Sequence, residues 1–149
     1  MSYSPLYFGS VGKASSRQTQ TGYANGSIST ILKGTPVSVN TSGQMVPTDI
    51  TVEASAEAFI GLCSVDTPSA ANGLVVSAGR VENVPPGGFS VRDVLYIAEG
   101  GVLTNVKPDL NATGFNSGDF VIMVGIFVKN EFSAGLFDIQ LMVTQIGQL

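Results

Sequence analysis

Four carboxylate residues are spaced so that they could act as acid and base in a hydrolytic reaction. The two candidate pairs are Asp93 with Glu99 and Asp109 with Asp119. Cleavage of a glycosidic bond by such a pair requires the carboxyl groups to lie roughly 5–10 Å apart across a cleft. Asp is also common in turns, where its side chain binds nearby backbone amides. We therefore interpret all four as solvated turn residues, with a carboxylate hydrolase as an alternative.

Residues 109–120 superficially follow the pattern of a calcium-binding loop. Asp109, Asn111 and Thr113 supply oxygen atoms at the first, third and fifth places, and Gly114 stands at the sixth. The twelfth place is Phe120, where a bidentate Glu is required, and no helix is expected on either side. We expect a polar turn that leads into a strand, and no bound metal.

The residue types best suited to catalysis are scarce. The chain contains no His and no Trp, its single cysteine is Cys63, and only 12% of its residues are charged. His is the usual proton carrier near neutral pH and the commonest metal ligand. Cys63 lies in an apolar run, which favours a buried and unreactive thiol. These features favour a non-enzymatic protein without cofactor or metal.

The first 27 residues combine large apolar groups with unpaired basic charge. Residues 1–48 contain three basic and no acidic residues, whereas residues 49–149 contain four basic and eleven acidic residues. The segment is too polar to offset its ordering entropy by burial alone. We predict an extended arm over residues 1–27 that docks on a partner protein, with a plain disordered tail as the alternative. The predicted docking residues are Tyr3, Leu6, Tyr7, Phe8, Lys13 and Arg17.

From residue 28 onward, short apolar runs alternate with Gly, Pro, Asn and Asp. This pattern is typical of all-β barrels and sandwiches. Helical composition is confined to residues 52–58. We predict a single all-β domain over residues 28–149, a barrel or sandwich, with strands at 35–40, 44–47, 57–65, 73–78, 80–84, 93–98, 101–104, 120–129 and 135–145.

The last of these strands has the clearest pattern. Phe137, Ile139, Leu141 and Val143 alternate with polar residues, which predicts one buried and one polar face. The longest apolar run, residues 120–128, is much shorter than the roughly 20 residues that span a bilayer. The N-terminus lacks the features of an export signal, and the basic residues are too dispersed for a nucleic-acid patch. We expect neither a membrane nor a nucleic acid as partner.

The two halves of the predicted domain share motifs in the same order. Residues 34–45 match residues 92–103, residues 60–64 match 124–128, and residues 71–76 match 133–138. These matches predict two related β-units. They also make Gly61 and Gly125 equivalent sites of close backbone approach or of a β-bulge.

Residues 31–149 resemble the small β-domains of tailed-phage capsid decoration and head-fibre proteins. The resemblance is carried by residues 34–39 with Gly43, and by residues 58–62, 93–104, 124–128 and 135–139. It implies a trimeric, tulip-like β-barrel that is made in the host cytoplasm and cements capsomers on the outer capsid surface. The implied partner is the major capsid protein or another virion structural protein. Residues 1–27 match no pattern of the family.

The weak charge of the domain independently favours a homo-oligomer, because an apolar surface left free would risk aggregation. The resemblance favours a trimer. A fibre-associated module that binds a receptor or a glycan is the alternative function, and exposed aromatic platforms would favour it.

Overall fold

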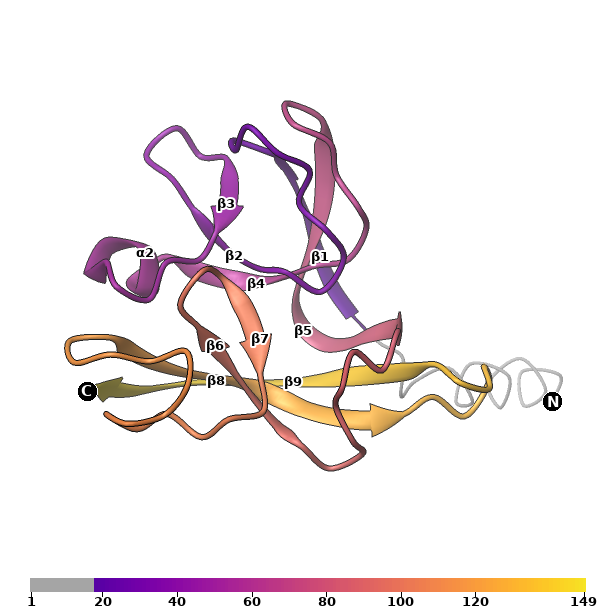
Figure 1. Cartoon of the computed structure of the whole chain (residues 1–149). Coiled ribbons are helices and arrows are strands. Elements are labelled where there is room, and N and C mark those ends of the chain that lie inside the picture. The colour runs from indigo at the N-terminus through magenta and orange to yellow at the C-terminus, as the bar shows by residue number, and fades with distance from the viewer. Residues whose placement is uncertain (1–17) are drawn as a thin grey trace, which may run out of the picture.

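The computed structural model describes residues 18–149, which form a nearly all-β domain with one short helix (Figure 1). The predicted all-β fold is confirmed, in the form of a curled sheet that makes a half-barrel. No helix in this part of the chain is long and apolar enough to cross a membrane. The elements are β1 (Gln18–Ala24), β2 (Pro36–Val39), β3 (Met45–Pro47), α2 (Glu53–Glu57), β4 (Phe59–Cys63), β5 (Asn72–Val84), β6 (Val94–Ala98), β7 (Val102–Thr104), β8 (Phe120–Lys129) and β9 (Phe137–Gln148).

The order of the strands in the sheet is symmetric about its centre. It runs β3-β2-β4-β5-β9-β8-β6-β7, so that β2–β5 form one unit and β6–β9 a second unit with the same internal order. In Figure 1 the second unit, coloured orange to yellow, lies below β2, β3 and β4 of the first. The two predicted β-units are therefore present and meet where β5 pairs with β9.

The register of the strands shows how closely the units correspond. Val37 of β2 pairs with Gly61 of β4, and Leu95 of β6 pairs with Gly125 of β8. In both cases the register shifts directly after this pair, as it does at a β-bulge. The first two matched segments of the sequence are thus equivalent in structure.

The third match differs from the structure by two residues. Val76 of β5 pairs with Leu62, and Gln140 of β9 pairs with Ile126, each one residue beyond the equivalent glycine. Val76 therefore corresponds to Gln140, whereas the sequence match aligned it with a residue two places earlier. A shift of two keeps every side chain on the same face of the strand, so the apolar pattern alone does not detect it.

The main core lies between the two units. Residues from both contribute to it, including Leu62 and Val76 from the first and Ile122, Val124 and Ile139 from the second. A smaller cluster consists of Ile31, Val37, Met45, Cys63 and Val75. Cys63 is fully buried, as predicted.

The expected strands 73–78 and 80–84 are one continuous strand, β5. Its first part pairs with β1 and β4, and its last part pairs with β9. Gly79 lies between the two parts with a φ of 90°, a conformation that glycine adopts without strain. A single strand thereby joins the two units.

Strand β1 was not predicted, because it falls inside the segment 1–27 that the sequence assigned to an arm. It pairs with β5 along its whole length, and Tyr23 packs against the smaller core cluster. Backbone pairing can hold a polar edge strand without much burial of side chains. Next to β1, the buried Asn25 donates a hydrogen bond from Nδ2 to the carbonyl oxygen of Thr67 (2.9 Å). In the structure, residues 18–27 are thus part of the β-domain.

Candidate functional site

The six residues predicted to dock on a partner lie outside the residues that the structure describes. They are Tyr3, Leu6, Tyr7, Phe8, Lys13 and Arg17.

Two of the candidate carboxylates organise turns. Asp93 accepts hydrogen bonds from the Ser90 amide and from Asn105 Nδ2, both at 2.8 Å. These bonds favour the charged form and hold the pKa of Asp93 below its usual range. Asp109 accepts a hydrogen bond from the Asn111 amide (3.1 Å). The contacts of Asp93 and Asp109 agree with the interpretation that both are turn residues.

The structure brings together a different carboxylate pair, Glu99 and Asp119. Asn116 bridges them, with its amide donating to Asp119 Oδ2 (2.8 Å) and its Nδ2 donating to Glu99 Oε1 (2.9 Å). Burial raises the pKa of Asp119, and the nearby carboxyl groups of Glu99 and Asp49 raise it further. Within residues 18–149, no group of three or more His, Cys, Asp or Glu side chains could hold a metal ion.

A more prominent feature of the surface is its exposed apolar side chains. Thirteen large hydrophobic residues are exposed in the described part of the chain: Ile28, Leu32, Val52, Val65, Leu74, Val91, Val102, Val106, Leu110, Phe132, Met142, Val143 and Ile146. Single exposed apolar residues are normal, whereas residues held rigidly or gathered together mark contact sites. Two places meet this criterion.

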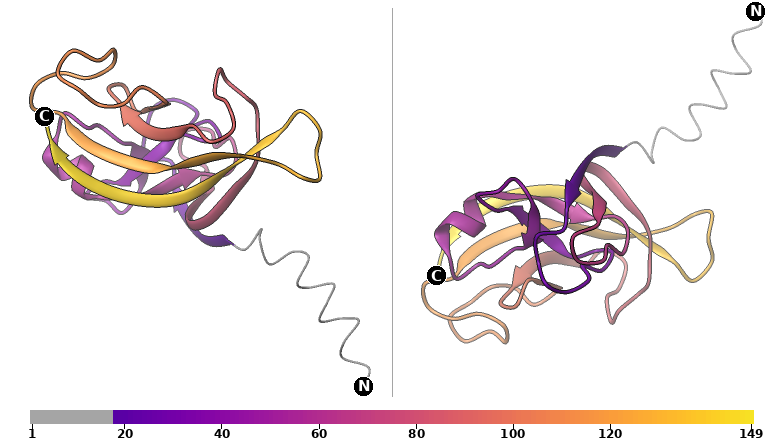
Figure 2. Two further views of the ribbon diagram at one scale, coloured as in Figure 1. Left: turned by 90° about the horizontal axis from the view of Figure 1, so that it is seen from below. Right: turned by 90° about the horizontal axis from the view of Figure 1, so that it is seen from above.

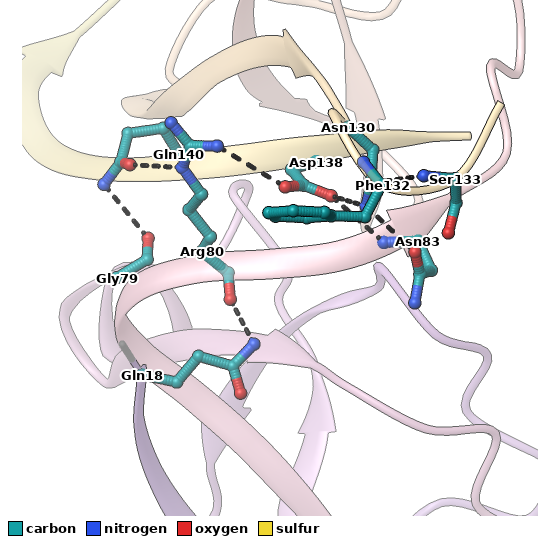
Figure 3. A network of polar contacts seen from close by, with 9 residues as sticks. All are labelled: Gln18, Gly79, Arg80, Asn83, Asn130, Phe132, Ser133, Asp138 and Gln140. Atoms are coloured by element: carbon teal, nitrogen blue, oxygen red, sulfur yellow. Dashed lines mark hydrogen bonds and ion pairs between the residues drawn. The ribbon is translucent and has the colours of Figure 1, made fainter. Parts of the chain in front are cut away.

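The first place is the turn between β8 and β9. This connection projects from the end of the domain opposite to the C-terminus in Figure 1 and in both views of Figure 2. Phe132, in this turn, is 77% exposed. Its amide and that of Ser133 both donate to Asn130 Oδ1, at 2.8 Å each, so the buried Asn130 fixes the turn that carries the aromatic ring (Figure 3).

A polar network braces the base of this turn (Figure 3). Asp138 Oδ1 accepts hydrogen bonds from Asn130 Nδ2 (2.8 Å) and from the Asn83 amide (3.2 Å). Asp138 Oδ2 lies 3.5 Å from Arg80 Nη1, and the side chain of Gln18 donates to the Arg80 carbonyl oxygen. The network joins β1, β5 and β9 to the turn that follows β8. In the described residues no buried side-chain polar atom lacks a hydrogen-bond partner.

The second place is the last part of β9, which we call the β9 surface and define by Met142, Val143 and Ile146. Every residue from 142 to 148 is exposed. Successive side chains of a strand point to opposite faces, so side chains on both faces of β9 are exposed here. Gln145 nevertheless contacts α2, because its Nε2 donates to the Ala56 carbonyl oxygen (3.0 Å). The register with β8 shifts twice in this stretch, once opposite Val124 and once at Ile146, which has no partner in β8. β-Bulges of this kind bend a strand and redirect its side chains.

Two shallow hollows, of about 310 and 240 Å³, border the β9 surface and share Val121 and Ile146. The first extends to Phe120 and Glu57. The second extends to Leu149 and also includes Tyr96, Lys107 and Pro108. The apolar surface thus continues from β9 onto the neighbouring strands.

The sequence did not single out the β9 surface or Phe132. The predicted alternation of β9 is confirmed only in part: Ile139 and Leu141 are buried, Phe137 is partly buried, and Asp138 of the predicted polar face is buried as well. It is wrong at Val143, which is exposed. The adjacent apolar pair Met142 and Val143, which breaks the alternation, was a detectable sign of the bulge. The absence of any charged side chain between residues 139 and 149 was a second sign.

No family model, no curated protein and no solved structure matches this chain.

Proposed function

We propose that this protein is a non-enzymatic virion structural protein that decorates or cements a bacteriophage capsid through subunit contacts. Its partner is the major capsid protein or another structural protein of the particle, and it acts on the outer capsid surface as a homo-oligomer, with a trimer favoured by the family resemblance. The observation that carries the proposal is the set of large apolar side chains held exposed on a rigid β-framework.

The energetics of protein interfaces support a binding role for the exposed side chains. Aromatic and aliphatic side chains that are buried at an interface supply most of its binding energy. A side chain held in place before binding loses less conformational entropy when it docks. Phe132 is a large exposed side chain of this kind, and Asn130 and Asp138 hold its turn in place.

The N-terminal arm is a second part of the proposal. Its apolar groups at residues 3, 6, 7 and 8 dock on the partner, and Lys13 and Arg17 steer the encounter. The body that follows carries the opposite charge, since residues 49–149 hold most of the acidic side chains. A partner surface that is acidic and apolar would bind the arm in preference to the body.

The test has two steps. Mass spectrometry of purified virions should detect the chain, and stripped virions should regain it when the purified full-length protein is added. A chain that is absent from virions, and does not bind them, contradicts the proposal.

The contributions of the arm and the turn are separated by two variants. Deletion of residues 1–17 tests the arm and spares β1, whereas Phe132→Ala tests the projecting turn. We expect each to reduce rebinding by about tenfold or more, the loss typical of an interface anchor. A matched control is Val102→Ala, which removes another exposed apolar side chain, 55% exposed, on β7.

Phe132 also favours a second candidate, a module that binds a receptor or glycan. An exposed aromatic ring can stack on the apolar face of a sugar. Binding of the purified protein to a glycan array, lost in Phe132→Ala and accompanied by unchanged rebinding to virions, would support this candidate over the first.

A further inference from the structure

We propose that the β9 surface, formed by Met142, Val143 and Ile146, binds a second copy of this chain and forms the core of the homo-oligomer interface. Self-association is part of the proposed function, and the inference adds where it takes place. It does not depend on the identity of the capsid partner.

The exposed apolar side chains of β9 are not required by the packing of the domain. Val76 of β5 corresponds to Gln140 of β9, but beyond this pair the two strands differ. β5 continues past Gly79 to pair with β9, whereas β9 stays paired with β8 through two register shifts. Met142, Val143 and Ile146 are exposed and belong to neither core cluster. Folding of the domain therefore does not explain why these three side chains are large and apolar.

Beyond Leu141, β9 is poorly covered by the rest of the domain. In the first unit, β1 pairs along residues 72–79 of β5. In the described residues, β9 beyond Leu141 pairs only with β8, and all residues from 142 to 148 are exposed. A strand with a free edge and exposed side chains is a site for association, and proteins usually protect such strands by charges, prolines or bulges. Here bulges are present, but residues 139–149 contain no charged side chain and no proline.

A second copy of the chain is the occupant that the charges favour. The chain has a net charge of −4, so two copies repel each other on average. The β9 surface carries no charged side chain, and the two hollows that border it contain one acidic residue, Glu57, and one basic residue, Lys107. This area has no net charge, so identical copies can approach here with less repulsion. A symmetric contact also uses the same patch on each copy, so its apolar groups meet apolar groups.

The bulges indicate how the copies meet. Edge-to-edge pairing of strands needs a regular row of backbone amides and carbonyls, and two bulges within seven residues interrupt it. The contact is therefore made by side chains. Ile146 lies between the two hollows, and Val121 and Leu149 extend the apolar area around it.

Light scattering of the full-length protein tests the inference. We expect an oligomer at micromolar concentration, and Ile146→Glu or Met142→Glu should raise the dissociation constant by roughly tenfold or more, because a charge is then placed in an apolar interface. Leu32→Glu is the matched control, since Leu32 is 59% exposed, as is Ile146. It should leave the oligomer intact.

A variant that misfolds could lose the oligomer for an unrelated reason, so a second measurement uses the wild-type protein. Hydrogen exchange of the amides of residues 142–148 should slow as the protein concentration rises, whereas exchange around Leu32 should not. A wild-type monomer at these concentrations overturns the inference. So does an oligomer that Ile146→Glu and Met142→Glu leave unchanged, or one whose β9 amides exchange at a rate independent of concentration. None of these results bears on whether the chain binds virions. A wild-type monomer would also remove the homo-oligomer from the proposed function, whereas an oligomer that is insensitive to the β9 variants would overturn this inference alone.

Discussion

Gly61 and Gly125 occupy the same position in the two units, and at each a Cβ atom would collide with a carbonyl oxygen of the next strand. A Cβ atom added to Gly61 would lie 2.1 Å from the Val76 carbonyl oxygen, and one added to Gly125 would lie 2.0 Å from the Gln140 carbonyl oxygen. Real Cβ atoms do not approach backbone atoms this closely, so any side chain here must displace a central strand. Both glycines serve the close contact of strands at the centre of each unit.

Gly125→Ala and Gly61→Ala should therefore each destabilise the fold by about 1–3 kcal/mol, the usual cost of overpacking a core. Chemical denaturation measures the loss. The control is Gly22→Ala in β1, where the nearest atom lies 3.8 Å from the added Cβ. That variant should be near neutral or slightly more stable. Equal effects at Gly22 and Gly125 would contradict the role of the close contact.

Asp138 should be important mainly as a hydrogen-bond acceptor rather than as a charge. Its Oδ1 accepts from Asn130 and Asn83, whereas its ion pair with Arg80 is long, at 3.5 Å, and partly exposed to solvent. Asp138→Ala leaves buried donors unsatisfied and should cost about 1–3 kcal/mol in the free energy of unfolding. Asp138→Asn keeps the acceptor and should cost clearly less.

The same pair of variants tests the bracing of the projecting turn. Amides of residues 131–136 should exchange faster in Asp138→Ala than in Asp138→Asn. If Asp138→Asn were as unstable as Asp138→Ala, the ion pair with Arg80 would be the dominant interaction.

The raised pKa of Asp119 predicts a pH dependence of stability. Because the pKa is higher in the folded protein than in the unfolded chain, the protonated carboxyl favours folding at low pH, and this contribution is lost as the pH rises through the folded pKa. Asp119→Asn removes the buried charge and keeps an acceptor for the Asn116 amide. Its melting temperature should exceed that of the wild type at pH 7, and the difference should shrink in acid.

Asp93 should behave in the opposite way, since its pKa is lowered in the folded protein. The Asp93 carboxylate stabilises the fold at pH values above the pKa of the unfolded chain, and this stabilisation is lost as the pH falls through the pKa of the folded protein. Asp93→Asn should therefore lower the melting temperature at pH 7. Thermal unfolding of both variants between pH 3 and pH 8 checks the signs, and a shift of the same sign for both would contradict the assignment.

Strand β1 should be required for the stability of the domain. Deletion of residues 1–24 removes the strand that pairs along β5 and leaves an open edge, which favours aggregation. The shorter deletion of residues 1–17 retains β1 and should melt close to the wild type. Thermal unfolding followed by light scattering distinguishes the two truncations. Equal melting temperatures would show that β1 contributes little.

The pattern of residue types was enough to predict the fold class and the repeat. Short apolar runs separated by turn residues predicted the strands from residue 36 onward, and the matched motifs located Gly61 and Gly125 as equivalent before their register was known. These features are local, because alternation of side chains and the steric freedom of glycine depend on a few neighbouring residues. The buried Cys63 followed in the same way from its apolar neighbours.

Which residues remain exposed, and which distant groups meet, depends on how the strands pack together. Val143 continues an alternating pattern that predicts burial, yet it lies in a bulge and no strand among residues 18–149 covers it. Polar β1 is held by backbone pairing with β5, for which the sequence carries no side-chain signal. Glu99 meets Asp119 rather than Asp93 because the strand order, not the spacing along the chain, brings their loops together. Burial and proximity are properties of the packed sheet, and a pattern of single residues does not contain them.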